Sequence, residues 1–142
     1  NIIAANREDS ISAIEALASV LLGRIAIVTG AGAMGKHAAR RWVQEIDRVG
    51  GVAAVRRRLP TGEADVATGV RLSEATTKGA VLVVLRHDYE PEGLDGGVAL
   101  LTEAFAEIHT FTAEGDGPLA QLLDLVLLAD ATAAALVRRT AG

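Results

Sequence analysis

The sequence contains no cysteine, which excludes disulfide bonds and thiolate metal sites. Its only run of basic residues is 56–58 (RRR), and its net charge is −4. This argues against a general nucleic-acid surface, which needs several clustered cations. No apolar stretch reaches the roughly 20 residues of a membrane-spanning helix, and no cationic start leads into an apolar signal core. We therefore expect a cytoplasmic protein that binds neither nucleic acid nor membrane.

The residues that are present predict one folded domain. The chain has 142 residues, half of them apolar, which is enough to bury a core and excludes disorder as the main state. We expect a single domain over 1–142, with a lead-in helix over 1–23 and an αβα core over 24–142. Because the sequence begins at Asn1 rather than Met, we also expect a processed chain or a piece of a longer one.

Hydrophobic periodicity predicts alternating strands and helices. Apolar positions at helical spacing predict a helix that is capped at Asp9 and Ser10 and ends at Gly23. The other expected elements are strands at 24–29, 52–55, 80–85 and 109–112, and helices at 36–49, near 98–108 and from about 118 onwards. This order predicts a three-layer α/β sandwich with a four- or five-stranded parallel sheet. Residues 61–78 read as either a loop or a loose helix.

The last predicted helix is apolar almost all the way round between Leu125 and Leu128. Such a helix is usually covered on both sides. We therefore expect it to be buried between the core and a second surface.

Glycines follow the first predicted strand in the pattern G-x-G-x-x-G, at Gly30, Gly32 and Gly35. This context fits a dinucleotide loop, but any parallel α/β domain also needs a tight turn here. NAD is disfavoured because residues 56–58 are arginines, where an acidic residue would hold the ribose; NADP is permitted.

Polar residues at the carboxyl ends of the strands are the other candidates for a site. Lys36 and His37 follow the glycine turn, where an anion would reach them, and Arg56 and Arg58 follow the second strand. The arginines read equally well as a solvated charge run. His87 and Asp88 suit either acid–base chemistry or a solvated loop. His109 reads as structural, and the three histidines share no metal-ligand spacing, so we predict no metal.

Four stretches at fixed spacing resemble a known family. They are 22–30 (LGRIAIVTG), 38–46 (AARRWVQEI), 58–66 (RLPTGEADV) and 114–120 (EGDGPLA). They are similar to the LAGR-x-P-x-V-x-G, A-x-R-W-x-x-Q-I, ELPE-x-x-HNE and EG-x-S-x-LA patterns in the C-terminal half of bacterial bifunctional phosphoglucose/phosphomannose isomerases. Those proteins consist of two sugar-isomerase (SIS) domains. The resemblance implies an SIS fold, a sugar-phosphate ligand and a second SIS domain or a homodimer as partner.

The sequence departs from the family's patterns at two positions where the family has catalytic residues. The family moves a proton between adjacent carbons with a glutamate base and opens the sugar ring with a histidine. Arg48 stands at the glutamate position and Ala64 at the histidine position. Arginine stays protonated and alanine has no ionisable group, so the resemblance implies that no catalytic residue remains here. A one-place shift of the alignment brings up Asp47 but still supplies no histidine.

The sequence therefore predicts a degenerate, non-catalytic SIS domain with neither cofactor nor metal. The predicted ligand is a sugar phosphate or another small anion, held by Thr29, Gly30, Gly32, Lys36, Arg48, Arg56 and Arg58. Two alternatives stay open. One is an active aldose–ketose isomerase half that a partner domain completes; the other is an NADP-binding domain of the Rossmann type.

Overall fold

The structure of the chain, a computed structural model, describes residues 2–58 and 78–141, with side chains from Asp9 onwards. The helices and strands follow one another in the order α1 (Ile2–Leu21), β1 (Ile25–Gly30), α2 (Gly32–Gln44), the π-helix η1 (Glu45–Val49), β2 (Ala54–Arg56), β3 (Ala80–Arg86), α5 (Asp95–Ala104), β4 (Ile108–Thr112) and α6 (Pro118–Ala141).

Four parallel strands form the described sheet, in the order β2-β1-β3-β4. The central strand β3 is buried at every position except its last residue, Arg86, which is half-buried. A continuous β-branched and aliphatic run suits such a strand, since both of its faces contact helices. The parallel α/β fold is therefore confirmed.

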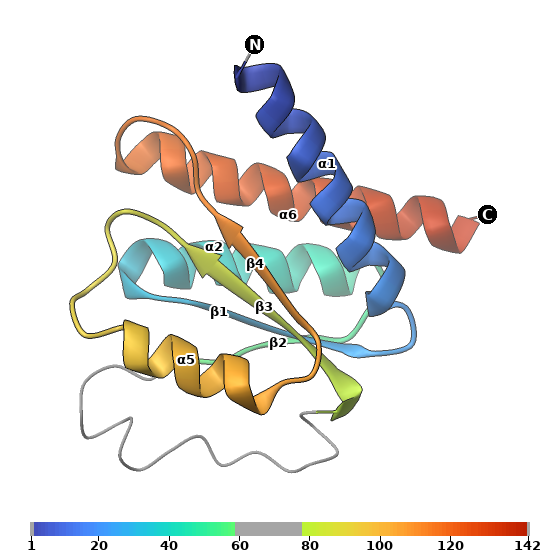
Figure 1. The fold of residues 1–142 in the computed structure, drawn as a ribbon. Helices are drawn as coiled ribbons and strands as arrows, with labels where there is room; N and C mark the ends of the chain where they lie inside the picture. Colours follow the sequence, from blue (N-terminus) through green and yellow to red (C-terminus); the bar gives the residue numbers. More distant parts are fainter. Residues whose placement is uncertain (1, 59–77, 142) are drawn as a thin grey trace.

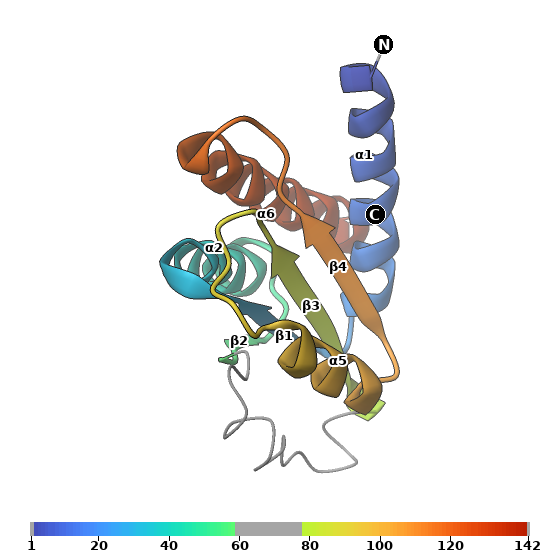
Figure 2. The ribbon, with the colours of Figure 1, turned by 60° about the vertical axis from the view of Figure 1, so that its left-hand side comes forward.

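Helices cover both faces of the sheet (Figures 1 and 2). Side chains of β1 alternate between the faces, so Ala26 and Val28 pack with α1, α2 and α6, while Ile27 packs with α5. The larger core lies under the three helices, where α1 crosses α6 in both views. The carboxyl ends of β1, β2 and β3 thus meet at one edge of a three-layer structure.

A single tryptophan fixes α2 against α6. The side chain of Trp42 is fully buried, and its ring centroid lies 5.1 Å from that of Phe111 on β4. Its indole Nε1–H donates to the Leu125 carbonyl oxygen over 2.9 Å. A buried indole needs such a partner, and here the partner is the backbone of the last helix.

Several sequence-predicted boundaries were wrong. The first helix begins at Ile2, so Asp9 and Ser10 lie inside it and do not cap it. The second helix begins at Gly32 rather than near Lys36, because Gly35 belongs to its first turn. Ile108 opens β4 and does not continue the preceding helix, since α5 ends at Ala104. The ambiguous stretch 61–77 lies outside the described residues.

The last helix has one covered and one open face. Leu125 is fully buried, but Leu127 is 64% exposed, so the chain itself covers one side of this helix, and the second covering surface stays a prediction. By length and composition, α6 is apolar enough to cross a membrane, contrary to our sequence-based expectation, yet 44% of its most apolar window is buried in the fold. Packing against the sheet, α1 and α2 accounts for the buried part of that apolar composition.

Candidate functional site: a basic pocket at the carboxyl edge of the sheet

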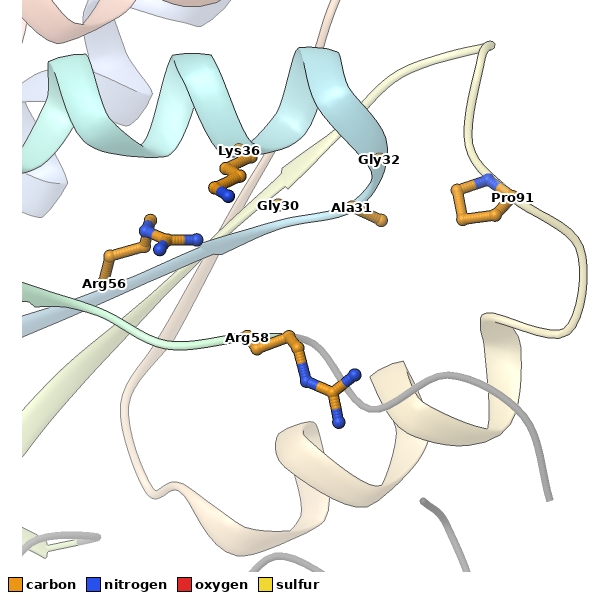
Figure 3. A pocket seen from close by; sticks show the side chains of 7 residues that line it. All are labelled: Gly30, Ala31, Gly32, Lys36, Arg56, Arg58 and Pro91. Atoms are coloured by element: carbon orange, nitrogen blue, oxygen red, sulfur yellow. The ribbon is translucent and has the colours of Figure 1, made fainter. Parts of the chain in front are cut away.

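A pocket of about 370 Å³ opens where β1 and β2 end. Its described lining consists of Gly30, Ala31, Gly32, Lys36, Arg56, Arg58 and Pro91 (Figure 3). This is the edge at which parallel α/β sheets bind ligands, because the strand ends and the following helix N-termini converge there.

Two glycines let the chain turn back on itself at the floor of the pocket. A Cβ added to Gly30 would lie 2.7 Å from the Gly35 carbonyl oxygen, and one added to Gly35 would lie 2.5 Å from the Gly30 carbonyl carbon. Any side chain at either position would collide with backbone. The first and last glycines of the G-x-G-x-x-G pattern are therefore explained by the close approach of β1 to the first turn of α2.

The helix that follows lacks a side-chain cap. Ala31 is the N-cap residue of α2, and alanine offers no oxygen to accept a hydrogen bond from the first backbone N–H groups. Uncapped N–H groups and the positive end of the helix dipole both favour an anion at this position.

Three cations line the same pocket, one from α2, one from β2 and one from the segment after β2. Lys36 projects from the second turn of α2 and Arg56 from the last position of β2, and the two side chains point toward one another (Figure 3). Arg58 follows two residues later on the same lining. None of the described lining residues is acidic. The opening therefore favours a ligand with more than one negative charge.

Five of the predicted ligand residues come together here: Gly30, Gly32, Lys36, Arg56 and Arg58. Thr29 does not line the pocket. It is fully buried, and its Oγ1 has no hydrogen-bond partner among the described residues. His37 is exposed beside the pocket without lining it.

Arg48 lies away from this pocket. It is exposed on η1, at the opposite end of α2 from Lys36, so the structure does not bring these two predicted ligand groups together. Ala64 lies outside the described residues. Among the residues that the structure does describe, no three histidine, aspartate or glutamate side chains gather in a metal-binding arrangement.

The sequence analysis did not predict that Pro91 lines the pocket or that His87 is buried. Pro91 lines the pocket from the loop after β3. His87 is only 5% exposed and does not line the pocket. It is therefore neither an acid–base residue of the pocket nor a solvated loop residue. Its Nε2 lies 2.8 Å from the Ala31 carbonyl oxygen. The position after a buried strand was the available signal, but the partner 56 residues earlier was not predictable.

Comparison with known protein families shows the family to which this chain belongs. A family model described as the bacterial phospho-glucose isomerase C-terminal SIS domain matches residues 12–139. The chain belongs to this SIS family. The match spans every described strand of the SIS domain, the second half of α1 and most of α6. No curated protein matches the sequence.

Solved structures agree on the fold. A glucose-6-phosphate isomerase-like protein from Thermus thermophilus is 17% identical, with a TM-score of 0.63 over 88% of this SIS domain and 43% of that chain. The sugar isomerase domain of an RpiR transcription factor from Sphaerobacter thermophilus is 14% identical, with a TM-score of 0.64 over 90% and 78% of the two chains. The SIS domain thus spans less than half of the Thermus protein.

Proposed function

We propose that the chain is one SIS domain that binds a sugar phosphate, or another small phosphorylated anion, without isomerising it alone. The observation that carries this proposal is the composition of the pocket. Its described lining offers three cations and the start of an uncapped helix, but no carboxylate and no imidazole. Cations and backbone N–H groups hold a phosphate, whereas aldose–ketose isomerisation needs a base to move a proton.

The sequence departures support the non-catalytic part of the proposal. Arg48 occupies the position that the resemblance assigns to the base, and a guanidinium cannot accept a proton at neutral pH. The competing proposal, an active half that a partner domain completes, requires that partner to supply both the base and the ring-opening histidine. An assay of glucose 6-phosphate conversion by the chain, alone and beside a second SIS domain, separates the two proposals.

A partner domain or a second copy forms part of the proposal. Leu119, Leu123 and Leu127 are 69%, 52% and 64% exposed, and their spacing of four places them on one face of α6. A leucine stripe of this kind, open to solvent in the chain alone, is typical of a helix that packs on another protein surface. The predicted cytoplasmic location also stays part of the proposal, and cell fractionation tests it.

The proposal is tested by a thermal-shift screen with glucose 6-phosphate, fructose 6-phosphate and mannose 6-phosphate, with inorganic phosphate and unphosphorylated glucose as controls. A ligand present at 100 times its dissociation constant adds about 2.7 kcal/mol to the free energy of unfolding. We expect a larger shift with a sugar phosphate than with phosphate, and none with glucose. No shift with any phosphorylated compound would contradict the proposal.

One observation favours a second candidate, an NADP-binding domain. Arg56 ends the strand next to β1 and shares a pocket with the glycine loop (residues 30–35). An arginine at this place would meet the 2′-phosphate of NADP. The same screen separates the candidates, because a shift with NADPH that neither NADH nor phosphate reproduces would favour the dinucleotide.

A further inference from the structure

The loop after β3 holds the glycine loop in place through a buried histidine. His87 makes two hydrogen bonds that fix its protons. The Tyr89 backbone N–H donates to Nδ1 over 3.0 Å, so Nδ1 carries no proton. The neutral ring then carries its proton on Nε2, which donates to the Ala31 carbonyl oxygen over 2.8 Å.

Ala31 is the residue on which the pocket geometry depends. It is 4% exposed, lies between Gly30 and Gly32 in the pocket lining, and is the N-cap of α2. Its carbonyl oxygen also accepts the Gly35 backbone N–H over 3.1 Å. The orientation of the Ala31–Gly32 peptide, and hence the direction of the Gly32 N–H, is thus set by two donors, one from α2 and one from His87.

The same loop contacts the pocket beyond the histidine. A Cβ placed on Gly32 would lie 3.5 Å from the Cδ of Pro91 and 3.8 Å from the Tyr89 carbonyl oxygen. Residues 89–91 therefore lie beside Gly32, close enough that a single added methyl group would contact them. Pro91 also lines the pocket, so this loop forms part of the pocket wall.

The loop is itself anchored to the last helix. Gln121 is 2% exposed; its Oε1 accepts the Asp88 backbone N–H over 3.0 Å, and its Nε2 donates to Asp88 Oδ2 over 2.7 Å. Arg86 and Glu90, which flank this segment in the sequence, form an ion pair at 2.8 Å. The segment that carries His87 is thus hydrogen-bonded both to α6 and to the glycine loop, as a positioning group requires.

We propose that His87 is a positioning residue for anion binding: from outside the pocket, its Nε2–H orients the Ala31–Gly32 peptide that forms the pocket floor. This inference rests on the proposed function and deepens it. His87 contacts no ligand and transfers no proton. It acts through a neutral imidazole that donates from Nε2 while accepting at Nδ1.

The test uses two variants of His87 and one control, each titrated with inorganic phosphate. His87→Ala removes the donor and should weaken phosphate binding by about tenfold, as expected for the loss of one buried hydrogen bond. His87→Gln keeps an N–H donor and an acceptor in similar places and should bind within about threefold of the parent chain. Trp42→Phe, which removes a buried N–H donor far from the pocket, should lower the melting temperature without changing the affinity.

A measurement without ligand tests the positioning role of His87 independently of the proposed phosphate binding. Amide hydrogen exchange at Gly35 reports on the Ala31 carbonyl, and it should be faster in His87→Ala and restored in His87→Gln. The imidazole ¹⁵N spectrum of the parent should show the Nε2–H tautomer.

If the parent binds no phosphate, the proposed function fails and the Gly35 exchange rates alone decide the positioning role. Unchanged exchange, the Nδ1–H tautomer, or phosphate binding by His87→Ala at the parent affinity would each overturn the inference.

Discussion

The two ends of α2 differ in what their residues do. At the N-terminal end, a tight glycine turn, an uncapped helix start and Lys36 face a pocket with Arg56 and Arg58. At the C-terminal end, the helix widens into η1, where Arg48 is exposed. The two cations Lys36 and Arg48 are twelve residues apart in the sequence, which is roughly 18 Å along a helix axis.

This difference shows why an alignment alone gives an incomplete account of the site. The resemblance directs attention to Arg48, which stands at the position that it assigns to the family's base. The structure directs attention to the other end, where cations and backbone donors gather. The C-terminal end of α2 is instead a packing site: Ile46 is fully buried and Gly50 lies directly under Leu136 of α6.

The largest effect is expected at the N-terminal end. Gly30→Ala places a Cβ 2.7 Å from the Gly35 carbonyl oxygen, and backbone on both sides leaves no room to relax. We expect a loss of about 3 kcal/mol in the free energy of unfolding, measured by urea denaturation. Gly79→Ala is the matched control, since its Cβ would meet none of the described residues within 4 Å. Equal stability of the two variants would contradict the close turn.

Gly50→Ala makes the corresponding change at the C-terminal end. Its Cβ would lie 2.6 Å from Leu136 Cδ1 and 2.8 Å from the Ile46 carbonyl oxygen. Because the leucine side chain can move and only the Ile46 carbonyl is backbone, we expect a smaller loss of about 2 kcal/mol. Phosphate affinity of the folded variant should stay at the parent value. A weakened affinity would mean that the two ends of α2 are coupled.

Single-charge substitutions compare the two ends directly. Lys36→Ala and Arg56→Ala should each weaken phosphate binding by about tenfold, or about 1.4 kcal/mol, and a salt concentration of about 0.5 M should reduce the difference. Arg48→Ala removes the same charge outside the pocket and should leave the affinity unchanged. Isothermal titration calorimetry measures all three. A loss in Arg48→Ala equal to that in Arg56→Ala would show that the ligand binds elsewhere.

The smallest effect concerns an ion pair between α1 and α6, where charge serves packing and not binding. Glu15 Oε1 and Oε2 lie 2.9 Å from Arg138 and 3.3 Å from Arg139, and hydrogen bonding to Arg138 lowers the pKa of Glu15 below its ordinary value of 4.5. A lowered pKa stabilises the folded chain above pH 4.5, and this stabilisation is lost as the pH falls through the folded value. Glu15→Gln should therefore be slightly less stable than the parent at neutral pH but not in strong acid. A constant difference in melting temperature would contradict this.

Most of the fold could be predicted because short stretches of sequence specify its helices and strands. The run at 80–85 predicts β3 from composition alone, and Pro118 marks the start of α6. The misassigned first cap has a local cause too: Asp9 and Ser10 suit an N-cap, yet the residues before them continue the helix.

The site was only partly predictable because its residues meet through the sheet order. Since β2 pairs with β1, Arg56 lies beside the glycine loop, and strand-end reasoning anticipates that contact. The bond from His87 to Ala31 depends on how two loops pack, and no periodic pattern encodes it. The predicted helix over 36–49 already places Lys36 and Arg48 at opposite ends, so the separation of Arg48 from the pocket could have been predicted from the sequence.

The most direct test of the central claim is an amide NMR titration of the ¹⁵N-labelled chain with glucose 6-phosphate, with the sugar signals followed in the same tube. We predict saturable shift changes at Gly30, Gly32 and Lys36, none at Arg48, and no fructose 6-phosphate formed. Shift changes confined to the Arg48 end of α2, or conversion of the sugar by the chain alone, would contradict the account.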